Sequence, residues 1–110
     1  MKWQTPYQGQ TYEFDDSRLS ASEARLQKRV TAGMSPVEAE RARGDLDPDA
    51  WIAALLIGMR RAGRDVDATT VIAADDVDLM AAARATRTTA QAARDTATAA
   101  AEEEPATPGS

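Results

Sequence analysis

The amino-acid sequence predicts a mainly α-helical small domain that begins with a β-hairpin and ends in a low-complexity tail. Three observations support this fold class. Strand-like and aromatic residues crowd positions 2–14, three helix-start signals follow, and alanine and threonine dominate after residue 80. Since 110 residues leave room for one modest core, we expect a folded domain over residues 1–80 and an Ala/Thr-rich tail over residues 81–110.

The hairpin is predicted by two strand-like stretches, WQTPY and QTYEF, on either side of the turn-forming pair Gln8-Gly9. Pro6 restricts its strand to an edge position because proline has no backbone N–H. A two-stranded hairpin is not stable alone, so its aromatic side chains should pack on helices. These side chains are Trp3, Tyr7, Tyr12 and Phe14.

Three helices are predicted from their N-terminal caps, in which a side-chain oxygen satisfies backbone N–H groups of the first turn. The cap signals are Ser20 with Glu23, Ser35 with Pro36 and Glu38, and Asp47 with Pro48 and Asp49. Glycines past the last turn are common helix ends, and here they are Gly33, Gly44 and Gly63. We expect helices over residues 21–31, 36–43 and 48–62.

The C-terminal third changes character twice. Residues 65–79 are rich in aspartate, and we expect a short helix near 68–74 followed by another short turn that ends at Met80. Residues 81–101 favour a helix but offer no large apolar side chain to bury, so such a helix is marginal in water. The final EEEPATPGS is typical of a disordered end.

The third helix is apolar nearly all the way round. One wide face is predicted to build the core, and it carries Trp51, Ile52, Leu55, Leu56 and Met59. The opposite side is normally polar on a surface helix, but here it carries Ala53, Ala54 and Ile57 beside Arg60 and Arg61. Either the tail or the acidic segment covers this side, or these five residues bind a protein partner.

Catalytic, cofactor-binding and metal-binding residues are not predicted. The chain has no cysteine and no histidine, which removes the thiolate metal ligands and the commonest general base. Asp45, Asp47 and Asp49 begin like a calcium loop, but Ala50 and Leu56 occupy the positions that need glycine and glutamate. The acidic group Asp75, Asp76 and Asp78 is better explained as a solvated turn, because no nucleophile or phosphate loop accompanies it.

The charge and the hydropathy pattern limit the partners. A net charge of -5, with arginines interleaved among acids, argues against nucleic acid and anionic lipid. The longest apolar run, 50–59, falls short of the ~20 residues that cross a bilayer. We therefore expect a cytosolic protein that binds neither nucleic acid nor membranes.

The order of features resembles the tail assembly chaperones of long-tailed, siphovirus-type actinobacteriophages. The resemblance rests on TYEFDDSRLSASEA, then GMSPVEAERA, then LDPDAWIAALLIGMRRAGRDVD and an acidic stretch that ends in DDVDL, and it covers residues 10–80. It implies a non-enzymatic protein that binds the tape measure protein, keeps it soluble and promotes tail-tube assembly. It also implies action in the host cytoplasm, contact with tail-tube subunits, a frameshifted long form, and absence from the finished virion.

Two other functions remain open at this point. The first alternative is a structural head–tail or tail adaptor that stays in the virion, and purified particles would distinguish it from a chaperone. A small regulatory protein is less favoured, since it needs a basic recognition helix that the charge distribution does not offer.

Overall fold

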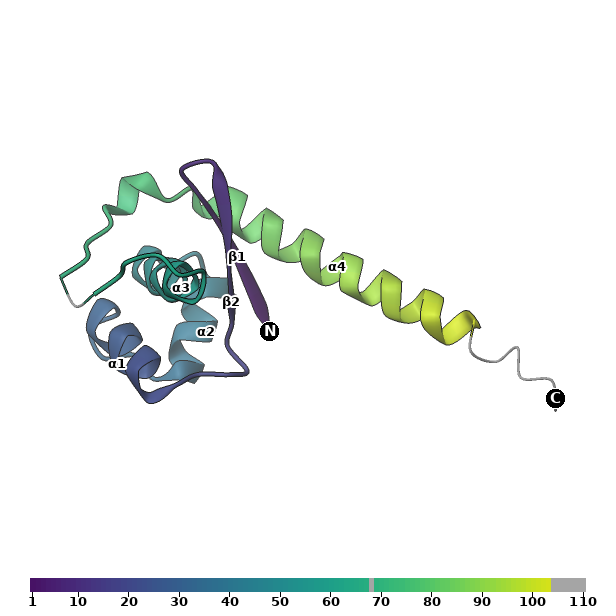
Figure 1. Ribbon diagram of the computed structural model, residues 1–110, viewed down its shortest axis with the longest axis horizontal. Coiled ribbons are helices and arrows are strands. Elements are labelled where there is room, and N and C mark those ends of the chain that lie inside the picture. Colours follow the sequence, from purple (N-terminus) through teal and green to yellow (C-terminus); the bar gives the residue numbers. More distant parts are fainter. Residues whose placement is uncertain (68, 104–110) are drawn as a thin grey trace.

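The computed structural model describes residues 1–67 and 69–103, and it confirms the mainly α-helical fold with an N-terminal hairpin (Figure 1). The elements in chain order are β1 (Lys2–Tyr7), β2 (Gln10–Asp15), α1 (Ala21–Val30), α2 (Pro36–Gly44), α3 (Pro48–Arg61), the short 3-10 helix η1 (Ala74–Asp76) and α4 (Leu79–Glu103). Figure 1 shows α1, α2 and α3 gathered on one side of the hairpin, whereas α4 runs away from this body.

The hairpin forms as predicted. Strands β1 and β2 pair antiparallel with Trp3 opposite Phe14, and the turn places Gln8 (φ 49°) and Gly9 (φ 78°) in the left-handed region. Two successive left-handed residues give the turn a twist that matches the strands on either side. Trp3, Tyr12 and Phe14 are buried, whereas Tyr7 is half-buried. The aromatic side chains therefore pack on the helical body, because a two-stranded sheet has no core of its own.

The predicted helix starts are confirmed, and two of the predicted ends are corrected. Capping boxes join Ser20 to Glu23 and Ser35 to Glu38, and the Asp47 side chain accepts from Ala50 N–H. The left-handed residues that end α1 and α2 are Ala32 (φ 56°) and Leu46 (φ 61°). Gly33 (φ 101°) also has a positive φ, one position after Ala32, whereas Gly44 lies inside the last turn of α2. Gly63 (φ 85°) itself takes the left-handed position just past its helix. Helix ends of this geometry satisfy free carbonyls, as when Asp47 N–H donates to Ala42 O over 2.9 Å.

Helix α3 lies at the centre of the core. Its predicted core face is confirmed for Trp51, Ile52, Leu55 and Leu56, which are at most 6% exposed, and Met59 is partly buried against them. The Trp51 ring meets Trp3 edge to face, with centroids 5.4 Å apart. Gly58 allows the closest approach to the hairpin, since a Cβ at this position would stand 3.0 Å from the Glu13 carbonyl oxygen. The helix thus packs on β2 with backbone nearly touching backbone.

The acidic segment and the tail differ from the prediction. No helix covers 69–73, and η1 takes up only residues Ala74–Asp76. Helix α4 then begins at Leu79 and packs against β1, with Ala82 0% and Thr86 2% exposed. These buried positions extend the folded body beyond residue 80. The disordered end was expected over residues 102–110, but Glu102 and Glu103 belong to α4. The rest of that expectation, over residues 104–110, lies outside the described residues.

A hydrogen bond explains how α4 is attached. Gln4 N–H on the outer edge of β1 donates to Thr86 Oγ1 over 2.9 Å, and this contact is buried. An unpaired strand edge exposes backbone groups that need partners. Helix α4 covers part of this edge, and that contact attaches the alanine-rich helix to the folded body.

Candidate protein-binding site

The side of α3 that the sequence offered as a partner surface is buried. Ala53 and Ile57 are 0% exposed, and Ala54 is 1% exposed. Both strands, α1, α2 and η1 pack against α3, and the acidic segment adds apolar side chains to the same cluster: Val66, Ile72 and Val77. The prediction that these three residues bind a partner is therefore wrong. The folded body itself covers this side, and the acidic segment contributes side chains to the same hydrophobic cluster, which removes apolar surface from water.

The two arginines predicted beside that surface have different roles. Arg60 is exposed, whereas Arg61 joins α3 to α1 through a two-pronged ion pair with Glu23. Arg61 Nε lies 2.6 Å from Glu23 Oε2, and Nη2 lies 2.9 Å from Oε1. Arg61 also donates to the carbonyl oxygens of Asp15 and Arg18, and its guanidinium lies 5.0 Å from the centre of the Phe14 ring. Arg61 thus connects α3 to α1, to the end of β2 and to the segment between β2 and α1.

The ion pair changes the acidity of Glu23. Hydrogen bonds from Arg61 lower the pKa of Glu23 from 4.5 to about 2, although burial acts in the opposite direction. Glu23 Oε1 also accepts from Ser20 N–H over 2.9 Å, as the third residue of the α1 capping box. One carboxylate therefore both caps a helix and binds another helix, which links local structure to packing.

A second polar cluster surrounds Arg43, whose side chain is 1% exposed. Its guanidinium donates to Gln27 Oε1 (3.1 Å) and to Asp16 Oδ2 (3.4 Å), and it stacks over the rings of Trp3 (4.6 Å) and Phe14 (5.3 Å). Burial lowers the pKa of Arg43 and Asp16 opposes this shift, but a guanidinium remains charged. The Arg43 Nε group alone has no hydrogen-bond partner among the described residues. The stacked rings supply part of the attraction that this buried cation loses from water.

Asp16 connects this cluster to the start of the chain. Its Oδ1 accepts from the Met1 ammonium (2.7 Å), and its Oδ2 accepts from the Trp3 indole (2.8 Å). Burial by itself raises the pKa of Asp16, but these two donors outweigh it, so the pKa lies below the ordinary value. The cluster therefore fixes the first strand against α2.

These contacts could not be identified from the sequence. In the sequence the arginines are interleaved among acids, and nothing local indicates that Arg43 has a partner 27 positions away at Asp16. Asp16 does stand within the TYEFDDSRLSASEA stretch that carried the family resemblance. Much of that stretch serves packing, because Phe14, Asp16 and Glu23 each bind a buried or partly buried arginine.

The aspartates that were weighed as metal ligands are mostly helix caps or exposed residues. Asp47 caps α3, and Asp78 Oδ1 accepts from Ala81 N–H (3.0 Å) in the first turn of α4. Asp75 and Asp76 are exposed in η1. Within residues 1–67 and 69–103, no three acidic side chains gather as a metal site would require.

A long exposed surface lies on α4. Every side chain described beyond Ala90, from Gln91 to Ala99, is exposed. A groove of about 630 Å³ runs beside this helix and reaches the start of the chain; its lining includes Met1, Arg87, Thr88, Ala90, Gln91, Ala92, Arg94 and Asp95. Figure 1 shows the outer half of α4 standing clear of the other elements. We therefore take the outer half of α4 as the candidate binding site.

Within the described part of the chain, no helix has both the length and the apolar character that a membrane span requires. Comparison with protein-family models, with curated proteins and with solved structures finds no match to this chain.

Proposed function

We propose that this chain is a phage tail assembly chaperone. It binds the tape measure protein in the host cytoplasm, keeps it soluble, promotes assembly of the tail tube around it, and leaves before the virion is complete. In this role the protein has no enzymatic activity and no cofactor. The proposal combines the family resemblance of residues 10–80 with the geometry of α4.

The observation that carries the proposal is the projecting helix α4. Its inner turns are fixed to β1, whereas Gln91–Ala99 expose alanine, threonine and a few charged side chains. A helix without tertiary packing is only marginally stable in water, so its outer half gains from contact with another chain. The exposed surface of α4 is thus suited to binding another protein. A partner bound there would displace no contact within the folded body.

A helical partner fits this surface best. Rows of alanine let a second helix approach to about 8 Å between axes, the short end of the range for packed helices. A long and partly apolar helical chain, which the resemblance implies for the tape measure protein, would bury its own apolar side chains against these rows. Exposed Gln91, Arg94 and Asp95 supply polar contacts at the rim.

The test is co-expression of this chain with fragments of the tape measure protein encoded beside it. We expect the fragments to become soluble and to co-purify with the chain. Ala92→Glu places a charge in the groove and should abolish co-purification. Ala93→Glu is the matched control, because Ala93 is also exposed on α4 but does not line the groove.

Two results would contradict the proposal in different ways. If both glutamate variants bind as well as the unchanged protein, the chaperone binds through another surface. If no fragment binds and the protein is instead found in purified virions, the structural adaptor becomes the better function.

A further inference from the structure

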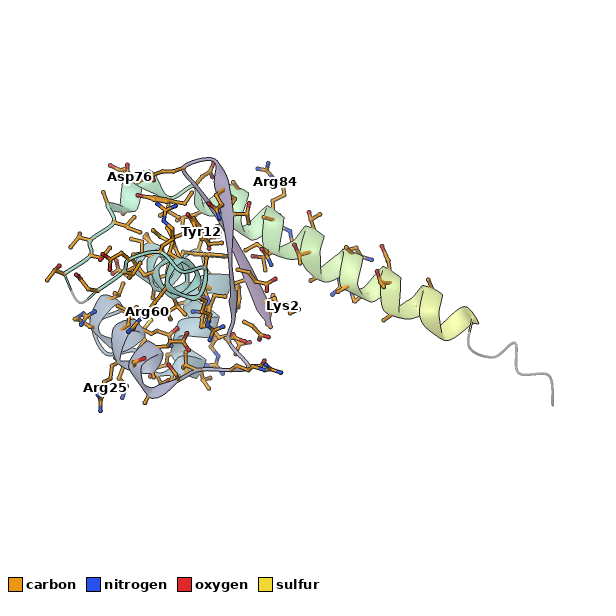
Figure 2. The ribbon with its side chains drawn as sticks, viewed as in Figure 1. Lys2, Tyr12, Arg25, Arg60, Asp76 and Arg84 are labelled. Carbon is orange, nitrogen blue, oxygen red and sulfur yellow. The ribbon has the colours of Figure 1, made fainter. Side chains whose placement is uncertain are left out.

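A groove between α1 and α3 gathers positive charge on an acidic protein. The groove measures about 320 Å³ and is lined by Ser22, Arg25, Leu26, Arg29, Arg60, Val66 and Asp67. Figure 2 labels Arg25 on α1 and Arg60 near the end of α3, on the side of the body opposite the free end of α4. This surface is therefore separate from the α4 site, and the inference from it does not depend on the tape measure assignment.

The three arginines are not neutralised within the described part of the chain. The described ion pairs involve Asp16 and Glu23, and neither pairs with Arg25, Arg29 or Arg60. Arg25 and Arg29 are four residues apart and so share one face of α1, whereas Arg60 approaches from α3. All three are exposed, although the chain as a whole carries a net charge of -5.

The one acidic residue of the groove has its own partners. Asp67 Oδ1 accepts from Thr69 N–H (2.7 Å), Thr69 Oγ1 (2.7 Å) and Thr70 Oγ1 (3.4 Å), which closes a local turn. These hydrogen bonds lower the pKa of Asp67. Three positive charges thus face one carboxylate that a turn already engages, so the groove retains a positive potential.

The bottom of the groove is apolar. Leu26 is 4% exposed and Val66 is 7% exposed, and both belong to the main hydrophobic cluster. A ligand that only neutralised charge would leave these side chains unused. The arrangement suits a segment that presents carboxylates at the rim and an apolar side chain between them.

We propose that this groove binds an acidic peptide segment of a protein partner. Carboxylates of the segment pair with Arg25, Arg29 and Arg60, and an apolar side chain contacts Leu26 and Val66. A nucleic acid is disfavoured, because three arginines offer few phosphate contacts and the rest of the chain repels a polyanion. Pairing of arginine with carboxylate also gives more directional hydrogen bonds than a point charge would.

The experiment titrates the full chain into a fluorescein-labelled peptide of sequence Glu-Glu-Leu-Asp-Glu. The matched peptide Gln-Gln-Leu-Asn-Gln keeps the shape and removes the charge. We expect the acidic peptide to bind at low salt, the neutral peptide to bind at least tenfold more weakly, and the difference to shrink as salt is raised.

Paired variants locate the site. Arg25→Gln with Arg60→Gln should weaken binding of the acidic peptide by roughly tenfold or more. Arg41→Gln with Arg84→Gln makes the same change in net charge at exposed positions outside the groove, and it should leave binding unchanged. Circular dichroism checks that both variants fold. We expect them to fold, because all four substituted positions are exposed.

Three results would overturn the proposal. If both pairs of substitutions weaken binding of the acidic peptide equally, the binding depends on the net charge of the chain and not on the groove. Equal affinity for the two peptides would remove the role of the carboxylates. Binding of a labelled single-stranded DNA, or self-association at rising concentration, that is lost only with the Arg25 and Arg60 substitutions would assign the groove to a nucleic acid or to a second copy.

Discussion

Helix α3 buries every residue from Ala50 to Gly58, whereas helix α4 leaves every side chain from Gln91 to Ala99 exposed. Both helices contain many alanines, yet the same residue type has a different role in each. In α3 the alanines let neighbouring elements approach on all sides, and in outer α4 they lie exposed on the helix surface. Alanine composition therefore says that a segment can be helical, but not whether it lies in the core.

The difference has a physical origin. Helix α3 places aromatic and branched side chains among its alanines, so the hydrophobic effect holds it inside the fold. Helix α4 has two buried attachment points in its first turns, Ala82 and Thr86, and intrinsic helix propensity supports the remainder. One helix is stabilised by its surroundings, and the other is stabilised mainly by its own backbone.

The strongest test of this comparison is Leu55→Ala in α3. Leu55 is 0% exposed, so the substitution leaves a cavity and should lower the free energy of unfolding by about 2–5 kcal/mol. Urea denaturation followed by tryptophan fluorescence measures the change. A loss below about 1 kcal/mol would mean that α3 is not the centre of the core.

Gly58→Ala tests how closely α3 lies against β2. The new Cβ would stand 3.0 Å from the Glu13 carbonyl oxygen, and we expect a loss of about 2 kcal/mol despite the better helix propensity of alanine. Gly44→Ala is the matched control, because a Cβ there meets no atom within 4 Å. If both variants are equally stable, the close approach does not limit the packing.

The ion pair at the end of α3 predicts a dependence on pH. The pKa of Glu23 is about 2 in the folded protein and 4.5 without partners. Its stabilisation is therefore complete above about pH 5 and is lost as the pH falls toward 2, since the unfolded chain takes up the proton first. Allowing for partial exposure, we expect it to contribute about 1–2 kcal/mol.

Unfolding of the unchanged protein and of Glu23→Gln, measured across this pH range, isolates that contribution. The stability difference between the two should be largest near neutral pH and should shrink toward acid. A difference that stays constant with pH would show that folding does not shift the pKa of Glu23, so that its charge does not stabilise the fold.

Thr86→Val tests the attachment of α4 to the hairpin. The shape is preserved, but Gln4 N–H loses its acceptor, so we expect a loss of about 1 kcal/mol and faster hydrogen exchange at the Gln4 amide. Thr88→Val changes an exposed threonine of the same helix and should have no such effect. Unchanged exchange at Gln4 would argue that α4 does not cover this strand edge in solution.

The smallest effect is expected in the outer half of α4. Ala97→Gly should reduce the helical circular dichroism signal, but it should leave the free energy of unfolding of the body within about 0.5 kcal/mol. Ala82→Gly, at a buried position of the same helix, should cost about 1 kcal/mol. Equal costs at the two positions would mean that the outer half belongs to the cooperative core.

The sequence by itself determined the local structure of this protein. The Gln8-Gly9 turn, the capping boxes that begin at Ser20 and Ser35, and the apolar face of α3 all depend on residues within a few positions of one another. Such interactions are encoded in a short window of the chain. The hairpin, the three helix starts and most of the core could therefore be predicted.

Only the tertiary structure decided which elements cover each face of α3 and the outer edge of β1. The burial of Ala53 and Ile57, the pairing of Arg43 with Asp16 and the attachment of Thr86 to Gln4 join residues that are far apart in the chain. The Gln4–Thr86 contact spans 82 positions, and alanine-rich composition gives no sign of which strand edge it meets. These long-range contacts buried the partner surface that the sequence had suggested, and they left the outer half of α4 exposed in its place.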